Sequence, residues 1–91
     1  MKNKQTTLYR LDFFFISNEK EVGEFINFYE SEEDAKAEIE WTLEGEYYRI
    51  IEFTVNADTY KSLGVVMLWE IEQFEIVREV TIYNKKTHIL Q

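Results

Sequence analysis

The chain has 91 residues, no cysteine and a formal net charge of −8, which comes from 18 acidic and 10 basic side chains. This length predicts one globular domain, residues 1–91, with a single modest core. The absence of cysteine excludes disulfides, thiolate nucleophiles and cysteine-based metal centres. The acidic balance argues against direct nucleic-acid binding, because proteins that bind phosphates present basic surfaces.

The apolar segments of the chain are too short to cross a membrane. The longest uninterrupted apolar run covers residues 65–69, whereas a spanning helix needs about 20 apolar residues. The first seven residues are mostly polar and lead into an alternating segment, which does not resemble a signal peptide. We therefore expect no membrane association and a cytoplasmic location.

The first elements in chain order are predicted to form an antiparallel hairpin. Every odd position from Leu8 to Ile16 is apolar, which is typical of a strand with one fully buried face. A polar turn at residues 18–21 leads to a second strand, residues 22–29, and so short a connection requires antiparallel pairing. Gly23 indicates a bulge in the second strand.

A helix is predicted next. Ser31 can accept a hydrogen bond from the first turn, and the acids at residues 32–34 are favourable at the positive end of a helix. We expect this main helix to run from about residue 32 to residue 44 and to end at Gly45, which supplies a left-handed C-cap. On a helical wheel, the stripe that faces the core consists of Ala35, Ile39, Thr42 and Leu43.

A third strand and a short helical turn follow. Residues 47–55 are rich in aromatic and β-branched side chains, which favours a strand. The inward side chains of this strand are predicted to be Ile51, Phe53 and Val55. The helical turn is predicted near residues 57–63, with Asn56 as its cap and Gly64 as its end.

The last third of the chain allows two interpretations. The apolar run at residues 65–69 suits a buried strand, and the alternation over residues 74–83 indicates another. A helix over residues 67–77 also fits the spacing, but the density of β-branched residues from 76 to 82 favours strands. A terminal strand over residues 86–90 is predicted to pair back as a hairpin.

Together these elements predict an α+β fold with two layers. We expect an antiparallel sheet of about five strands, with the main helix (about 32–44) packed on one face and the short helical turn near 57–63. No linker and no internal repeat interrupts the pattern, so the whole chain is predicted to be one domain.

Few side chains could carry out catalysis or bind a metal. The single histidine, His88, lies near the end of the chain and the glycines are isolated, so we predict no nucleophilic triad, histidine zinc site or phosphate loop. Glu70 and Glu72 would lie about 7 Å apart on one strand face, a spacing that paired acids or a hard cation could use. A solvated strand face explains this pair better. We therefore predict no enzyme activity, no catalytic or metal site and no cofactor.

The negative charge is concentrated in one segment. Residues 19–46 contain eleven acids and two bases, a balance of −9, and the rest of the chain is nearly neutral. On the helical wheel Trp41 lies opposite the core stripe and between two rows of acids. A tryptophan framed by carboxylates is typical of the centre of a protein–protein interface; the alternative is that another segment or a second copy covers it as core. The predicted contact residues are Glu30, Glu33, Asp34, Glu38, Glu40, Trp41, Glu44 and Glu46.

Two functions of different classes fit these features. The first is a binding protein or inhibitor whose acidic face docks on a basic partner, such as a nucleic-acid-binding enzyme, in the groove that phosphates would fill. In size and composition, but in no motif, the chain resembles phage-encoded anti-defence proteins, including anti-CRISPR proteins and DNA mimics. The second is a small self-assembling regulatory or structural domain, for example a homodimer, whose acidity serves only solubility. The first is favoured.

Overall fold

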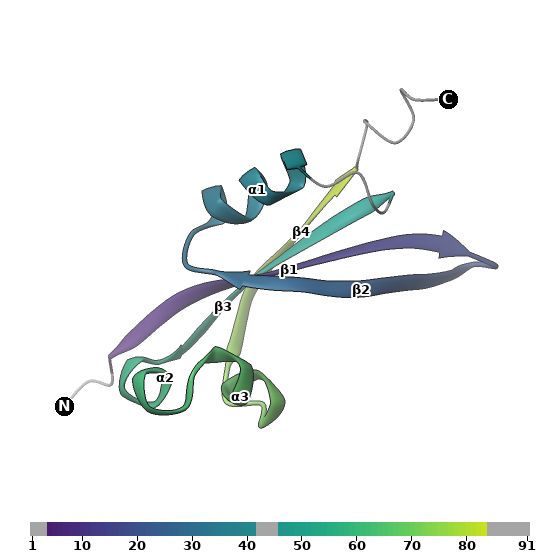
Figure 1. Cartoon of the computed structure of the whole chain (residues 1–91). Helices are drawn as coiled ribbons and strands as arrows, with labels where there is room; N and C mark the ends of the chain where they lie inside the picture. The colour runs from purple at the N-terminus through teal and green to yellow at the C-terminus, as the bar shows by residue number, and fades with distance from the viewer. Residues whose placement is uncertain (1–3, 42–45, 84–91) are drawn as a thin grey trace.

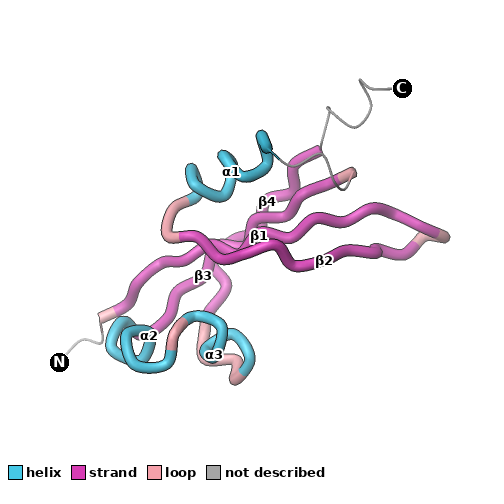
Figure 2. The backbone as a smooth tube through the Cα atoms, viewed as in Figure 1, coloured by secondary structure: helices cyan, strands magenta, loops and turns pink. Residues whose placement is uncertain are grey.

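The computed structural model describes residues 4–41 and 46–83, which form one antiparallel sheet and three helices. The elements are β1 (Gln5–Ser17), β2 (Lys20–Tyr29), α1 (Glu32–Trp41), β3 (Tyr47–Asn56), α2 (Ala57–Leu63), α3 (Val65–Glu70) and β4 (Glu75–Tyr83). The strand order is β2-β1-β3-β4, and all neighbours are antiparallel (Figure 1 and Figure 2). The α+β class is confirmed, with four strands in the described residues in place of about five. The strand predicted at residues 86–90 lies outside the described residues.

β1 and β2 form a hairpin that is closed by a two-residue turn. Asn18 and Glu19 both have positive φ angles, 52° and 65°, as in the type I′ turn whose twist matches that of the strands. The register of the two strands shifts near the middle of β1 and not at Gly23, so the predicted bulge position is wrong. Gly23 is required by a close approach instead, because a Cβ atom there would lie 2.4 Å from the carbonyl oxygen of Phe13.

The helices cover opposite faces of the sheet, each over a different half. Leu8 and Phe53 are cross-strand partners, and so are Leu11 and Ile50. Since side chains alternate along a strand, Leu8 and Leu11 point to opposite faces. α3 packs on the first pair and α1 packs on the second. Figure 1 shows α1 on one side of the twisted sheet and α2 with α3 on the other.

The core is therefore divided into two clusters. The α1 core contains the buried residues Leu11, Ala35, Tyr48 and Ile50, and the α3 core contains the buried residues Leu8, Phe53, Val55 and Leu68. The predicted inward residues of β3 are buried, but Tyr48 and Ile50 are buried on its other face as well. The arrangement is thus helix, sheet and helix, and the predicted two-layer packing on a single face is wrong.

The apolar run at residues 65–69 forms helix α3 and not the predicted buried strand. Helical spacing places Leu68 in the α3 core and packs Val65 and Trp69 against the same core. A short continuous apolar run has no period that distinguishes a buried strand from a helix. The choice is made by tertiary packing, because the α3 core needs a cover on the face that α1 does not reach.

The ends of α2 and α3 follow local capping rules. The side chain of Asn56 accepts a hydrogen bond from the Thr59 N–H at 3.0 Å, and Gly64 ends α2 with a φ of 82°, so the predicted helical turn and both of its ends are confirmed. α3 ends in a Schellman motif, in which the Gln73 N–H donates to the Leu68 carbonyl at 2.9 Å.

Candidate binding surface

The cap of α1 fixes where the helix begins, and the residues that it packs against the sheet fix which side of it faces solvent. Ser31 Oγ accepts a hydrogen bond from the Asp34 N–H at 3.1 Å, so the predicted cap is confirmed. Ala35 is fully buried in the α1 core, and Ile39 packs against that core one turn later. The described helix ends at Trp41. The remaining residues of the predicted helix end, Thr42, Leu43, Glu44 and Gly45, lie outside the described residues.

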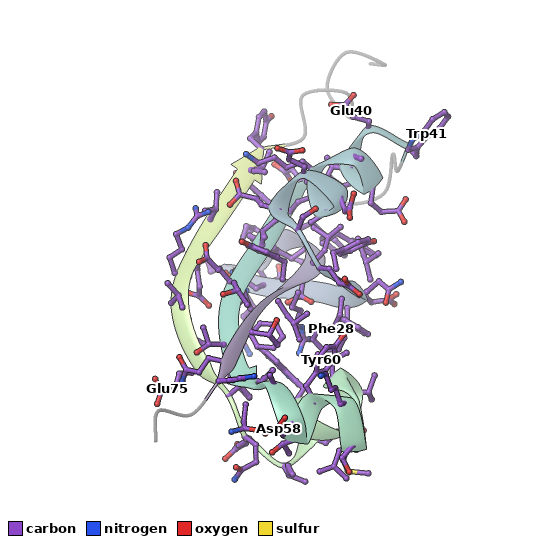
Figure 3. The ribbon with its side chains drawn as sticks, turned by 90° about the vertical axis from the view of Figure 1, so that its left-hand side faces the viewer. Phe28, Glu40, Trp41, Asp58, Tyr60 and Glu75 are labelled. Carbon is purple, nitrogen blue, oxygen red and sulfur yellow. The ribbon has the colours of Figure 1, made fainter. Side chains whose placement is uncertain are left out.

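Trp41 is the most exposed large apolar side chain in the described residues, with 85% of its surface open to solvent. It follows Ile39 by two positions, which turns it away from the sheet, and Figure 3 shows it pointing outward beside Glu40. Asp34 lies two helical turns before Trp41 on the same side, and Glu33 and Glu40 form the adjoining row. The predicted outward orientation of Trp41 is confirmed.

Not all of the predicted contact residues share this surface. We define the α1 outer face by its exposed members, Glu33, Asp34, Glu40 and Trp41, whereas Glu30 is also exposed but precedes the helix. Glu38 is only half-exposed and accepts a hydrogen bond from the Tyr29 hydroxyl at 3.2 Å. Glu46 lies at the entry to β3, where its N–H donates to the Phe14 carbonyl at 3.2 Å. Glu44 lies outside the described residues, so its predicted role stays a prediction.

Glu32, the first residue of α1, forms ion pairs within the fold. Its carboxylate pairs with Lys36 at 2.8 Å and with Arg78 of β4. The Arg78 guanidinium also pairs with Glu52 of β3 at 2.7 Å. These ion pairs connect the first turn of α1 to β4 directly and to β3 through Arg78.

The Tyr29–Glu38 hydrogen bond predicts a loss of stability at alkaline pH. Burial, together with the charge of the Glu38 carboxylate, raises the pKa of Tyr29 from 10.0 to about 12. The folded state therefore holds the phenol proton more tightly than the unfolded state, so this stabilisation is complete below pH 10 and is lost as the pH rises toward 12. We expect the free energy of unfolding to fall over this range, and to fall less in Tyr29→Phe. Urea denaturation across the range tests this, and equal pH slopes for the two proteins would contradict it.

A cleft of about 210 Å³ lies on the half of the α3 face that the helices leave uncovered, and it was missed by the sequence analysis. Gly23 lines the cleft without a side chain, beside two arginines that are stacked on aromatic rings. The Arg49 guanidinium lies 4.5 Å from the centre of the Phe14 ring, and that of Arg10 lies 4.9 Å from the centre of the Phe25 ring. The only sequence signal was the polar residues among the even positions of β1.

The charges of this cleft are balanced internally. Arg10 pairs with Asp12 at 2.8 Å, and Arg49 pairs with Glu21 at 2.7 Å. Because each arginine already has a carboxylate partner, the cleft does not favour an anionic ligand.

The described residues do not provide a metal centre. No group of three or more His, Cys, Asp or Glu side chains among them could hold a metal ion. The strand that was expected to carry Glu70 and Glu72 does not exist: Glu70 ends α3 and Glu72 follows it with a φ of 58°. His88 lies outside the described residues.

No described helix is both long enough and apolar enough to cross a bilayer.

Two surfaces therefore stand out, the α1 outer face and the cleft on the opposite face of the sheet. The α1 outer face carries the more exposed aromatic side chain, 85% for Trp41 against 45% for Phe25 in the cleft.

The chain matches no protein-family model, and it shows no significant similarity to a curated protein or to a solved structure.

Proposed function

We propose that the protein is a non-enzymatic protein-binding module whose α1 outer face docks on a basic surface of its partner. The observation that carries this proposal is Trp41, which is 85% exposed at the end of an acidic helix. An exposed tryptophan contributes little to the core of its own chain, but its burial in a partner's pocket is typical of interface hot spots.

The acids around Trp41 define the chemistry of the partner. Glu33 and Asp34 lie in the first turn of α1 and Glu40 lies in its last, about 10 Å further along the helix, so one side of the helix presents negative charge at both of its ends. A basic groove that accepts phosphates is therefore electrostatically complementary to the α1 outer face. On this basis we propose a nucleic-acid-binding enzyme as the partner, which the protein inhibits by occupying the groove.

The small size and the acidic composition of the chain support a more specific form of this proposal. They resemble those of phage-encoded anti-defence proteins, so we propose an anti-CRISPR-like or DNA-mimic role in the host cytoplasm. The proposal involves neither direct contact with nucleic acid nor a membrane, and it needs no cofactor.

A pair of charge-reversed variants tests the docking surface. Glu33→Lys/Glu40→Lys reverses two acids of the α1 outer face, and Glu70→Lys/Glu75→Lys makes the same change in net charge at exposed positions elsewhere. We expect wild type and the control to capture the same basic partner from the host, and the α1 variant to capture far less of it. The binding is then repeated with the purified partner, and duplex DNA should compete with the wild-type protein. Equal binding by the two double variants would contradict the proposal.

A further inference from the structure

The outer edge of β2 is exposed where the hairpin projects beyond the helices (Figure 1). Residues 20–25 of this strand are all exposed. Val22 keeps 46% of its surface open, and its neighbour Phe15 on β1 keeps 40%. Exposed edge strands act as templates for pairing with another chain. We propose that this edge pairs antiparallel with the same edge of a second copy, with the two Val22 residues facing each other at the two-fold axis.

The backbone of the hairpin determines which groups are available for this pairing. Ser17 and Lys20 flank the two-residue turn and face each other across the hairpin. They form the hydrogen-bonded pair that such turns require, so the backbone groups of Lys20 point toward β1. Because the direction alternates along the strand, the groups of Glu21 and Gly23 point away from the sheet. In a register centred on Val22, Glu21 of one copy exchanges two hydrogen bonds with Gly23 of the other.

The same register also pairs opposite charges. A two-fold axis perpendicular to the sheet makes each face continuous with the same face of the second copy, so only residues on the same face can oppose each other. With Val22 at the axis, Lys20 of one copy lies opposite Glu24 of the other, and symmetry repeats the pair. Neither residue takes part in an ion pair within the described chain. Gly23, which lacks a side chain, leaves room for the opposing Glu21.

Neighbouring registers lack this complementarity. Centres at Glu21 or Glu24 oppose identical carboxylates, and centres at Gly23 or Phe25 pair no opposite charges within β2. On the other edge strand, β4, no residue-centred register places Arg78 opposite a glutamate of that strand. The Val22 register therefore joins two four-stranded sheets into one continuous sheet through β2.

A charge swap tests the register. Lys20→Glu or Glu24→Lys alone puts like charges opposite each other at both symmetric positions, whereas the double swap restores opposite charges. In sedimentation equilibrium we expect wild type to dimerise, each single variant to dimerise roughly 5- to 30-fold more weakly, and the double swap to recover the wild-type constant within about threefold. A wild type that stays monomeric at all concentrations, or a double swap no better than the single variants, would overturn the proposal.

Cysteine crosslinking gives an independent test, because the chain contains no cysteine. Directly opposed residues of a non-hydrogen-bonded pair have Cα atoms about 4.5 Å apart, within the range of a disulfide. We expect oxidised Val22→Cys to form a covalent dimer rapidly and Glu24→Cys, which faces Lys20 in this register, to do so slowly. Equal rates would overturn the register. The pairing uses no residue of α1, so Trp41 variants should dimerise normally and the β2 variants should still bind the partner.

Discussion

Replacing Phe53 with alanine is expected to lower the free energy of unfolding by about 3–5 kcal/mol, the usual cost of truncating a buried phenylalanine. Phe53 has no exposed surface. Its ring contacts those of Phe28, Trp69 and Phe74 edge-on, with centroid distances of 5.8, 5.0 and 5.8 Å. These rings come from β2, α3 and the segment before β4, so the alanine variant leaves a cavity where four parts of the chain meet.

Urea denaturation measures this effect, with two variants as controls. Phe15→Ala removes the same atoms from a side chain that is 40% exposed, and it should cost clearly less. Phe53→Leu keeps most of the volume, and it should cost less than about 1.5 kcal/mol if the neighbouring rings repack. A small domain has only about 5–15 kcal/mol of total stability, so the leucine variant provides a measurement even if the alanine variant does not fold. Equal losses for Phe53→Ala and Phe15→Ala would contradict the assignment of the α3 core.

Replacing Trp41 with alanine is expected to have the opposite profile, with little effect on folding and a large effect on binding. A side chain that is 85% exposed should change the free energy of unfolding by no more than about 0.5 kcal/mol. As an interface anchor it should contribute at least about 2 kcal/mol to binding, which corresponds to a loss of affinity of about 30-fold or more. Calorimetric titration of the purified partner measures the affinity.

Val66→Ala is a matched control for this prediction. Val66 is 57% exposed on α3, on the face of the sheet opposite α1. We expect it to bind the partner as the wild type does. If Trp41→Ala and Val66→Ala both retained wild-type affinity, Trp41 would not be a contact residue.

The sequence predicted those elements that have a clear period or a clear cap. Alternation located β1 and β4, the density of aromatic and β-branched residues located β3, and Ser31 and Asn56 cap their helices as expected. α3 was not predicted, because the run at residues 65–69 has no period. Its helical state depends on contacts of Leu68 and Trp69 with strands that are distant in sequence.

The arrangement of the layers follows from the lengths of α1 and β1, which the sequence only partly revealed. A helix of ten residues is about 15 Å long, whereas the thirteen residues of β1 span about 43 Å. One such helix cannot cover the sheet, so a second cover is required. The face on which it lies depends on the connection from β3, and hydrophobic alternation alone could not show it.

The candidate surface was predicted where it depends on one helix and missed where it depends on contacts between elements. The orientation of Trp41 follows from the position of Ala35 and Ile39 on the same wheel. The half-buried state of Glu38 depends on Tyr29, which belongs to another element. The cleft likewise appears only once strand pairing brings Arg10 and Arg49 to the same face.

The central claim is that an acidic face with an exposed tryptophan binds a basic partner. The most direct test is the dissociation constant of the purified protein–partner complex, measured at increasing salt concentration for wild type and for Glu33→Lys/Glu40→Lys. We expect the wild-type affinity to fall steeply with salt, because attraction between surface charges is screened beyond about 10 Å at 0.1 M ionic strength. The variant should bind more weakly at low salt and respond less to added salt. A wild-type affinity that does not change between low and high salt, or a variant that binds as tightly as wild type, would contradict the claim.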